Sequence, residues 1–169
     1  LAAIICMLIY IAIRFEFFTG LCTFVALLHD ILVMCALCAI CRIQINSAFI
    51  AALITIIGYS INNTIVVFDR VRELWKVNIG SNALTFTDIV DKGIKQTFTR
   101  TLYTSLTTLF AVIMLAILGA GSIQEFVIPI IFGLVAGTFS SLFIAGPMLA
   151  LISNKRTISF RMKKITDAK

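Results

Sequence analysis

Charged residues are scarce in this sequence. They occupy 13% of its 169 positions, whereas apolar residues occupy 60% and the mean hydropathy is +1.07. Apolar runs as long as the roughly 18 residues that indicate a transmembrane helix recur along the chain. Such a composition is incompatible with a soluble domain. The sequence therefore predicts an integral membrane protein.

Proline and regular alternation of apolar and polar residues are also rare. The chain has two Pro and fourteen Phe, and it has no series of alternating segments. An outer-membrane barrel would show alternating segments of about ten residues. The membrane segments are therefore predicted to be helices, and the expected fold class is all-α, a polytopic membrane helix bundle.

Five apolar segments of the sequence are predicted to span the membrane. They cover about residues 1–13, 21–41, 47–68, 97–118 and 126–152. The first is shorter than the roughly 20 residues that a bilayer requires. Because it also lacks an initiator Met, we expect the chain to begin inside a longer protein.

A short amphipathic helix is predicted between the third and fourth spans, over about residues 87–96. Thr85-Phe-Thr-Asp88 resembles a capping box, and Phe86, Val90 and Ile94 follow at helical spacing. We expect this helix to lie at the inner membrane interface. The alternative is a solvated loop with a few apolar residues.

The basic residues are distributed asymmetrically. With the turn at Arg14, the segment 69–100 and the tail 153–169 on one side, every Lys and Arg except Arg42 lies on that side. The positive-inside rule makes this side cytoplasmic, with the start of the chain outside. The net charge of +6 then points to anionic lipids as partners, and not to nucleic acid, because no basic face carries aromatic side chains.

The sequence has no residue pattern for covalent chemistry. A nucleophile with a base, a glycine-rich phosphate loop and a paired carboxylate site are all missing, so we expect neither an enzyme nor a bound cofactor. Cys35, Cys38 and Cys41 have the spacing of metal ligands, but this series drifts around a helix and lacks a fourth ligand. We interpret them as small apolar fillers.

Polar residues inside the predicted spans are the main functional signal. The third span contains Gly58, Tyr59, Ser60, Asn62 and Asn63. Polar groups at this depth cost free energy and therefore indicate a function. One helical face of this span is expected to look into protein or water, and it carries Thr55, Tyr59, Asn62 and Asp69.

Two other spans carry ionisable residues. Arg100 begins the fourth span at about the depth of Asn63, and hydroxyl residues such as Thr104 follow it. These hydroxyls either return hydrogen bonds to their own helix or belong to an ion path with Arg100; Arg100 itself could also snorkel to the headgroups. In the second span, His29 and Asp30 form an ionisable pair that we expect to face the bundle interior. The pair is either a functional site or a structural feature, satisfied by mutual pairing or by Ser and Thr of neighbouring helices.

Three motifs resemble the SecF family, whose members are membrane subunits of bacterial protein export. The segment Gly58–Glu73 resembles the family's Gly-Tyr-Ser-x-Asn motif, the segment ending in His29-Asp30 its Leu-x-His-Asp motif, and Gln96–Thr101 its Gln-Thr-x-x-Arg-Thr motif. The resemblance implies a bundle of the SecD/SecF and multidrug-exporter permease type. It also implies that this chain holds the last five of six spans.

The resemblance further implies a mechanism and partners. A SecF subunit of the inner membrane works with SecD and couples a proton or sodium gradient to late movement of an unfolded preprotein through SecYEG. The family's ion path corresponds to Asn63 and Arg100 in this sequence. The family typically has Asp where this chain has Asn63, which cannot ionise. We expect SecD to supply the carboxylate, with Asp30 or Asp69 as weaker candidates.

Two alternatives and one structural role stay open. The chain could be a non-conducting structural subunit of the export complex, which the loss of the carboxylate favours, or a small-molecule exporter of the same superfamily. The charged end of the third span is expected to hold structural ion pairs, formed by Asp69, Arg70, Arg72 and Glu73.

Overall fold

The computed structural model describes residues 17–78 and 85–152 of the chain. They form helices α2 (Phe17–Ile40), α3 (Ser47–Asn78), α4 (Phe86–Leu118) and α5 (Ser122–Ser140), a π-helical segment η1 (Ser141–Ala145) and helix α6 (Gly146–Ile152). No strand occurs in these two ranges, and the predicted all-α class is confirmed. The predicted first span 1–13 and the tail 153–169 lie outside the described residues.

Four described segments are long and apolar enough to cross a membrane: Thr19–Ile40, Ser47–Asn78, Phe86–Leu118 and Ile123–Leu151. The 32 residues of α3 extend about 48 Å, well beyond the roughly 30 Å of a hydrocarbon core. Helix α3 therefore continues past the predicted third span 47–68, and its last turns carry the charged residues from Asp69 onward.

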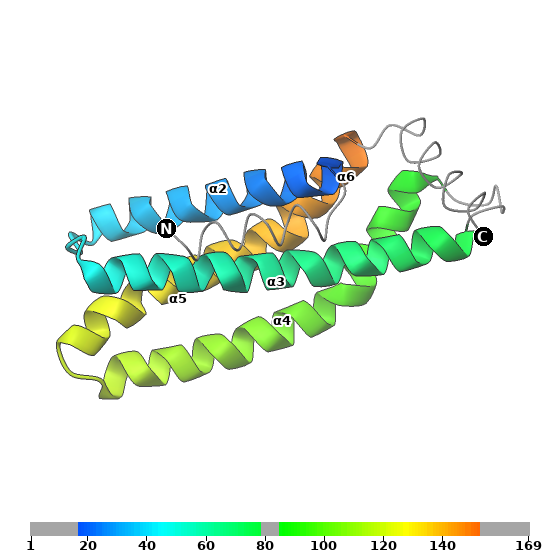
Figure 1. Ribbon diagram of the computed structural model, residues 1–169. Helices are drawn as coiled ribbons and strands as arrows, with labels where there is room; N and C mark the ends of the chain where they lie inside the picture. The colour runs from blue at the N-terminus through cyan, green and yellow to red at the C-terminus, as the bar shows by residue number, and fades with distance from the viewer. Residues whose placement is uncertain (1–16, 79–84, 153–169) are drawn as a thin grey trace.

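Helix α5 lies at the centre of the bundle and contacts α2, α3 and α4 (Figure 1). Two groups of buried apolar side chains hold these helices together. One, near Trp75, includes Val67, Phe86 and Leu142, and the other, at the opposite end, includes Met34 and Ile56. The two ends of the bundle are called the Trp75 end and the Asn46 end below.

A polar clamp fixes the Asn46 end. The side-chain Oδ1 of Asn46 accepts a 2.9 Å hydrogen bond from the Phe49 N–H, as an N-cap does for the first turn of α3. The same side chain donates through Nδ2 to Glu125 Oε2 at 2.6 Å. Helices α3 and α5 therefore start side by side and run parallel.

The segment predicted as an interfacial helix, 87–96, is continuous with the fourth span in α4. Asp88 Oδ2 accepts a 3.0 Å hydrogen bond from the Thr85 N–H, as the capping box predicted. Phe86 and Val90 are buried in the core near Trp75, and the rings of Phe86 and Trp75 meet edge-on at 5.1 Å. Figure 1 shows these first turns at an angle to the rest of α4. They cover the Trp75 end of the bundle.

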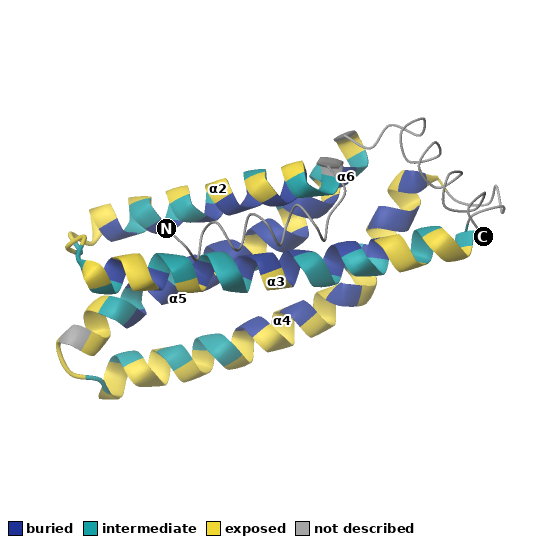
Figure 2. Cartoon of the chain, in the orientation of Figure 1, coloured by how far each residue is buried: buried dark blue, intermediate teal, exposed yellow. Residues whose placement is uncertain are grey.

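The other half of α4 packs loosely. Its buried side chains end at Ser105, and beyond it large apolar residues such as Phe110 and Ile117 are each 68% exposed. Figure 2 shows this half of α4 in the colours of exposed and intermediate residues. Such a surface requires lipid or another membrane helix against it.

Candidate functional site

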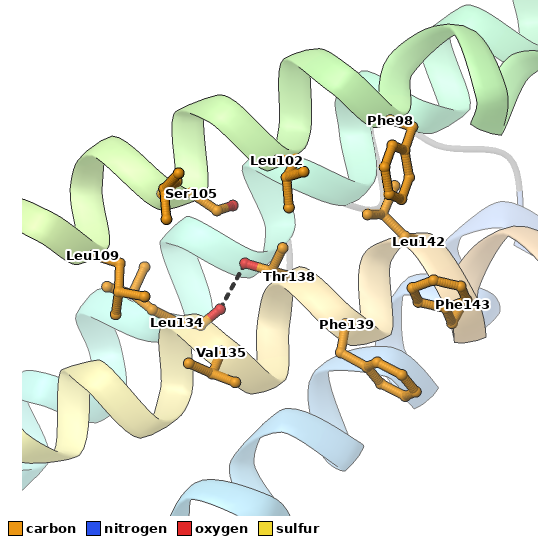
Figure 3. Close-up of a pocket in the computed structure, with 11 residues that line it drawn as sticks. Phe98, Leu102, Ser105, Leu109, Leu134, Val135, Thr138, Phe139, Leu142 and Phe143 are labelled. Carbon is orange, nitrogen blue, oxygen red and sulfur yellow. Dashed lines mark hydrogen bonds between the residues drawn. The ribbon is translucent and has the colours of Figure 1, made fainter.

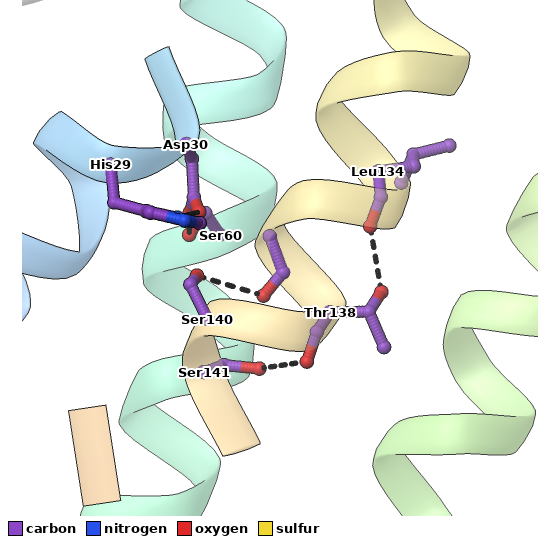
Figure 4. A network of polar contacts seen from close by, with 8 residues as sticks. His29, Asp30, Ser60, Leu134, Thr138, Ser140 and Ser141 are labelled. Atoms are coloured by element: carbon purple, nitrogen blue, oxygen red, sulfur yellow. Dashed lines mark hydrogen bonds and ion pairs between the residues drawn. The ribbon is translucent and has the colours of Figure 1, made fainter. Parts of the chain in front are cut away.

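Asp30 lies at the centre of a polar contact between three helices (Figure 4). Its side chain is 1% exposed, and Ser60 of α3 donates a hydrogen bond from Oγ to Asp30 Oδ2 at 2.5 Å. On α2 itself, His29 Nδ1 lies 3.2 Å from Asp30 Oδ1. Asp30 thus faces the bundle interior as predicted, whereas the His29 side chain is 35% exposed.

Gly137 of α5 is the third helix's contribution to this contact and lies against Asp30 and Ser60. A Cβ atom at position 137 would lie 3.3 Å from Ser60 Cβ and 3.5 Å from both Asp30 Oδ2 and Ser60 Oγ. The missing side chain lets the α5 backbone approach the carboxylate closely. One turn earlier, a Cβ at Gly133 would come within 2.6 Å of the Ile56 side chain. The small residues of α5 therefore serve helix packing.

The hydroxyls of α5 and η1 hydrogen-bond within their own helix. Thr138 donates to the Leu134 carbonyl at 2.7 Å, Ser140 to the Gly137 carbonyl at 3.3 Å, and Ser141 to the Thr138 carbonyl at 3.1 Å. Ser140 and Ser141 are fully buried beside the contact at Asp30. Their position coincides with the start of the π-helical segment, a distortion often found at functional sites.

The predicted polar face of α3 lies only partly on the outside of the described bundle. Thr55 and Asn62 are exposed, whereas the buried face carries Ile56, Ser60 and Asn63. The packing of α3 on α5 explains this difference, because the small Ser60 is the residue that fits against Gly137. Periodicity located a polar stripe on α3, but not the side on which its neighbours pack.

Tyr59 connects α3 to α4. Its hydroxyl donates a 3.1 Å hydrogen bond to Ser105 Oγ. Tyr59 is half-buried and Ser105 is buried. Tyr59 was a candidate site residue from the sequence, and Ser105 was noticed only as one of many hydroxyls. The link between them could not be found without knowing which faces of α3 and α4 meet.

Asn63 and Arg100 lie in different environments. Asn63 is 4% exposed, and its Nδ2 has no hydrogen-bond partner among the described residues. Arg100 is exposed on α4, and its guanidinium forms no hydrogen bond or ion pair with another described residue. The two residues suggested by the resemblance are therefore not hydrogen-bonded to each other here.

The hydroxyls that follow Arg100 return hydrogen bonds to their own helix. Thr104 Oγ1 donates to the Arg100 carbonyl and to the Thr101 carbonyl, both at 3.0 Å, and Thr107 and Thr108 make similar bonds. The sequence left two interpretations open for these hydroxyls, hydrogen bonds within their own helix or an ion path with Arg100, and the bonds described here are of the first kind.

The charged end of α3 forms contacts that the sequence predicted only in part. Arg70 Nη1 pairs with Glu73 Oε2 at 2.5 Å, one turn along the helix. Arg70 Nε also donates to Gln96 Oε1 of α4 at 2.8 Å. Arg72 is exposed, and Asp69 and Gly58 are half-buried. Gln96 therefore helps to hold the first turns of α4 against α3.

An apolar cleft of about 270 Å³ lies between α4 and the end of α5 (Figure 3). Side chains such as Phe98 and Leu102 line it from α4, and Phe139 and Phe143 from the opposite side. Its volume is slightly below that of typical ligand pockets, and no charged group lines it. The cleft therefore offers a polar substrate no fixed anchor.

The family model for "Protein export membrane protein SecD/SecF, C-terminal" matches residues 1–155 of the chain. The chain belongs to this family. The match covers the contact between His29, Asp30 and Ser60, as well as the Asn63 and Arg100 positions. The resemblance that the three sequence motifs indicated is thereby confirmed.

Relatives of the SecD/SecF family give the same result. The "Protein translocase subunit SecF" of Alicyclobacillus acidocaldarius is 44% identical over 148 residues, which are 88% of this chain and 48% of that protein. The subunit of the same name from Rickettsia prowazekii is 36% identical over 169 residues, 100% of this chain and 52% of that protein. The chain thus spans about half the length of these relatives.

Crystal structures of SecDF have the same arrangement of membrane helices. One, described as the super-membrane-facing form, is 34% identical with a TM-score of 0.80, over 94% of this chain and 21% of that one. Another, described as a translocon-associated membrane protein from Thermus thermophilus, is 35% identical with a TM-score of 0.79, over 85% of this chain and 20% of that one. The described helices are therefore a SecD/SecF membrane bundle, in a multi-pass membrane protein.

Proposed function

We propose that this chain is the membrane part of a SecF-type subunit that works with a SecD-type partner in the bacterial inner membrane. Together they use an ion gradient, of protons or sodium, to drive a late step in the export of an unfolded preprotein through the SecYEG channel. The subunit performs no covalent chemistry. In this orientation the first described helix, α2, begins at the cytoplasmic side of the membrane. Anionic lipids are the expected partners of the basic tail.

The exposed Arg100 is the observation that supports this proposal most directly. A guanidinium at membrane depth is costly unless water or an opposite charge reaches it. Arg100 lies on the outer surface of the bundle, and the polar side chain of Asn62 is also exposed, on α3. A partner bundle that supplies a carboxylate against this surface would satisfy the guanidinium. The site is then shared between two subunits.

The structural alternative, a subunit that stabilises the export complex without conducting ions, rests on Asn63. This side chain is buried, cannot ionise and leaves its Nδ2 unpaired within the described part of the chain. It therefore carries no proton. The other alternative, a small-molecule exporter, would need a roomy substrate cleft, and the apolar cleft of about 270 Å³ is smaller than typical ligand pockets.

Substitution of Asn63 and Arg100 in the full-length subunit separates these functions. The subunit and its SecD-type partner are reconstituted with SecYEG in proteoliposomes, and preprotein release is measured with and without an imposed ion gradient. We expect Asn63→Asp to change the dependence of release on pH or on sodium. Arg100→Gln should abolish the stimulation by the gradient, while Arg100→Lys keeps part of it.

A scaffold would respond differently. If both variants release preprotein like the parent, with the same dependence on the gradient, the coupling role is wrong and the structural alternative holds. Thr108→Val serves as the matched control on α4, because the Thr108 hydroxyl bonds only to the Thr104 carbonyl of its own helix.

A further inference from the structure

We propose that His29 and Asp30 form a proton-binding pair in the interior of the bundle, and that Ser60 and Gly137 hold this pair in place. The pair takes up and releases one proton, which the imidazole and the carboxyl group share. Its use in export rests on the proposed function above, whereas the binding of the proton does not.

Asp30 is the first reason for this assignment. It is the one acidic or basic side chain buried within the described residues, near the middle of the 24-residue helix α2. An isolated carboxylate in such a place carries a large desolvation penalty. Among the described residues two groups offset it, the Ser60 hydroxyl at 2.5 Å and His29 Nδ1 at 3.2 Å. Binding of a proton removes the net charge from the interior.

Within the described helices, no other charge lies near enough to fix the charge of this pair permanently. The charged side chains of α3 begin at Asp69, nine residues and about 13 Å beyond Ser60. On α5 the one charged residue is Glu125, about 18 Å before Gly137. The segments η1 and α6 carry no charge, and the phenol of Tyr59 is directed to Ser105. The cysteines of α2 lie at least five residues from Asp30.

His29 gives the buried carboxylate a link to the bundle surface. Its imidazole is 35% exposed, while Nδ1 contacts Asp30. The ring binds a proton at Nε2 and passes the proton on Nδ1 to Asp30 Oδ1, so the ring stays neutral and the carboxylate gains one proton. Return of that proton to Nδ1 and loss of the one on Nε2 reverse the step. Because the two groups interact directly, the proton belongs to the pair and not to one residue.

The geometry favours a proton over a metal ion. A Cβ at Gly137 would already lie 3.3 to 3.5 Å from Ser60 and Asp30, so the α5 backbone leaves no room for an ion with its hydration shell. Hard cations such as calcium or magnesium are held by six or more oxygens. The described part of the chain has no group of three or more acidic, His or Cys side chains that could hold a metal ion.

Protonation of the pair would change a contact that joins three helices. Ser60 of α3 donates a hydrogen bond to the carboxyl group of Asp30 on α2, and this carboxyl group lies against Gly137 of α5. A neutral carboxyl accepts this hydrogen bond more weakly than a carboxylate. The position of α2 against α3 thus becomes sensitive to proton binding, in a chain where Asn63 cannot titrate.

The test measures proton binding directly and needs no preprotein. The full-length subunit with its partner is labelled with ¹⁵N at His and ¹³C at the Asp carboxyl, placed in liposomes and titrated by magic-angle-spinning NMR. This sequence has a single His, and His29→Gln assigns its signals. We expect the His29 ring nitrogens and the Asp30 carboxyl to report one shared transition. Asp30→Asn should abolish or displace the His29 transition, and Ser60→Ala should move the shared midpoint by about one pH unit.

Ser141→Ala is the matched control, because its hydroxyl bonds to a carbonyl of its own helix; it should leave the midpoint unchanged. If the parent shows no change of protonation of the pair during the titration, or if sodium in place of potassium displaces the transition, the inference is overturned. The parent titration and Ser60→Ala decide the question even if Asp30→Asn does not fold. If the pair binds a proton but export by the same subunit does not depend on the ion gradient, the proposed function is wrong and the proton site is still supported.

Discussion

The hydroxyl of Tyr59 and Oγ of Ser105 lie 3.1 Å apart and join α3 to α4. This bond is made beside the buried face of α3, where α4 starts to lose contact with the bundle. Beyond Ser105, the side chains of α4 are intermediate or exposed. The Tyr59–Ser105 bond therefore marks the boundary between the packed half of α4 and the half that needs lipid or a partner.

Removal of this hydrogen bond should weaken the bundle by a small and specific amount. We expect Tyr59→Phe to lower the free energy of unfolding by about 1 kcal/mol, because both partners are at least half-buried. A double-mutant cycle with Ser105→Ala in the full-length protein, unfolded by a denaturing detergent, should give a coupling energy of about 0.6 kcal/mol. A coupling energy of zero would mean that the two hydroxyls do not interact in the membrane. Tyr103→Phe, on the exposed face of α4, is the control.

At the Asn46 end of the bundle, the Asn46 side chain makes two contacts, and their contributions to stability can be measured separately. Its Oδ1 caps α3, and its Nδ2 binds Glu125. We expect Asn46→Ala to lose both and to cost about 1 to 2 kcal/mol of unfolding free energy. Glu125→Ala removes the clamp alone and should cost less.

Asn46→Asp distinguishes the two contributions. Aspartate keeps the oxygen that caps α3, but it places a second carboxylate against Glu125, so it should resemble or exceed the cost of Glu125→Ala. If Asn46→Asp is as stable as the parent in the same detergent titration, the clamp contributes nothing. Equal losses for Asn46→Ala and Glu125→Ala would instead show that the cap contributes nothing.

The sequence predicted the ends of several helices well because polar breaks mark them. The second span was expected to end near residue 41, and α2 ends at Ile40; α3 begins at Ser47 and α4 ends at Leu118, as expected. Each of these ends is followed or preceded by a polar or glycine-containing turn, which periodicity and composition detect. The continuation of α4 through the predicted interfacial segment was not foreseen, because no local signal separates a bent helix from two helices.

The contacts of the site depend on pairs far apart in the sequence. Asp30 was identified as an interior residue because a charge in a membrane helix must find a partner. That its partners are Ser60 and the bare backbone of Gly137 depends on the register between α2, α3 and α5, which no single helix encodes. For the same reason the sequence, which predicted only that the face with Thr55 and Asn62 looks into protein or water, did not indicate that these two residues are exposed on the described bundle.

Close packing of α5 on α3 leads to a prediction for Gly133. A Cβ there would lie 2.5 Å from Ile56 Cγ1, closer than side chains approach one another, so Gly133→Ala must push α3 and α5 apart. We expect a loss of about 1 to 3 kcal/mol in unfolding free energy. Ile56→Ala removes the opposing atoms and should restore part of this loss when combined with Gly133→Ala. Additive losses in the double variant would mean that the two positions do not touch.

The side-chain amide of Asn63 allows a direct test of what an unpaired buried polar group costs in stability. Its Nδ2 is buried without a partner among the described residues, and such a group costs about 1 to 3 kcal/mol. We expect Asn63→Leu, which has a similar volume, to raise the free energy of unfolding of the full-length protein. Asn62→Leu, on the exposed side of the same helix turn, should change it by less than about 0.5 kcal/mol. A lower stability of Asn63→Leu would show that the amide has a partner within the full-length subunit, such as a water molecule or a residue outside the described ranges. If Asn63→Leu stabilises the subunit alone but destabilises its complex with the SecD-type partner, the amide is paired by that partner.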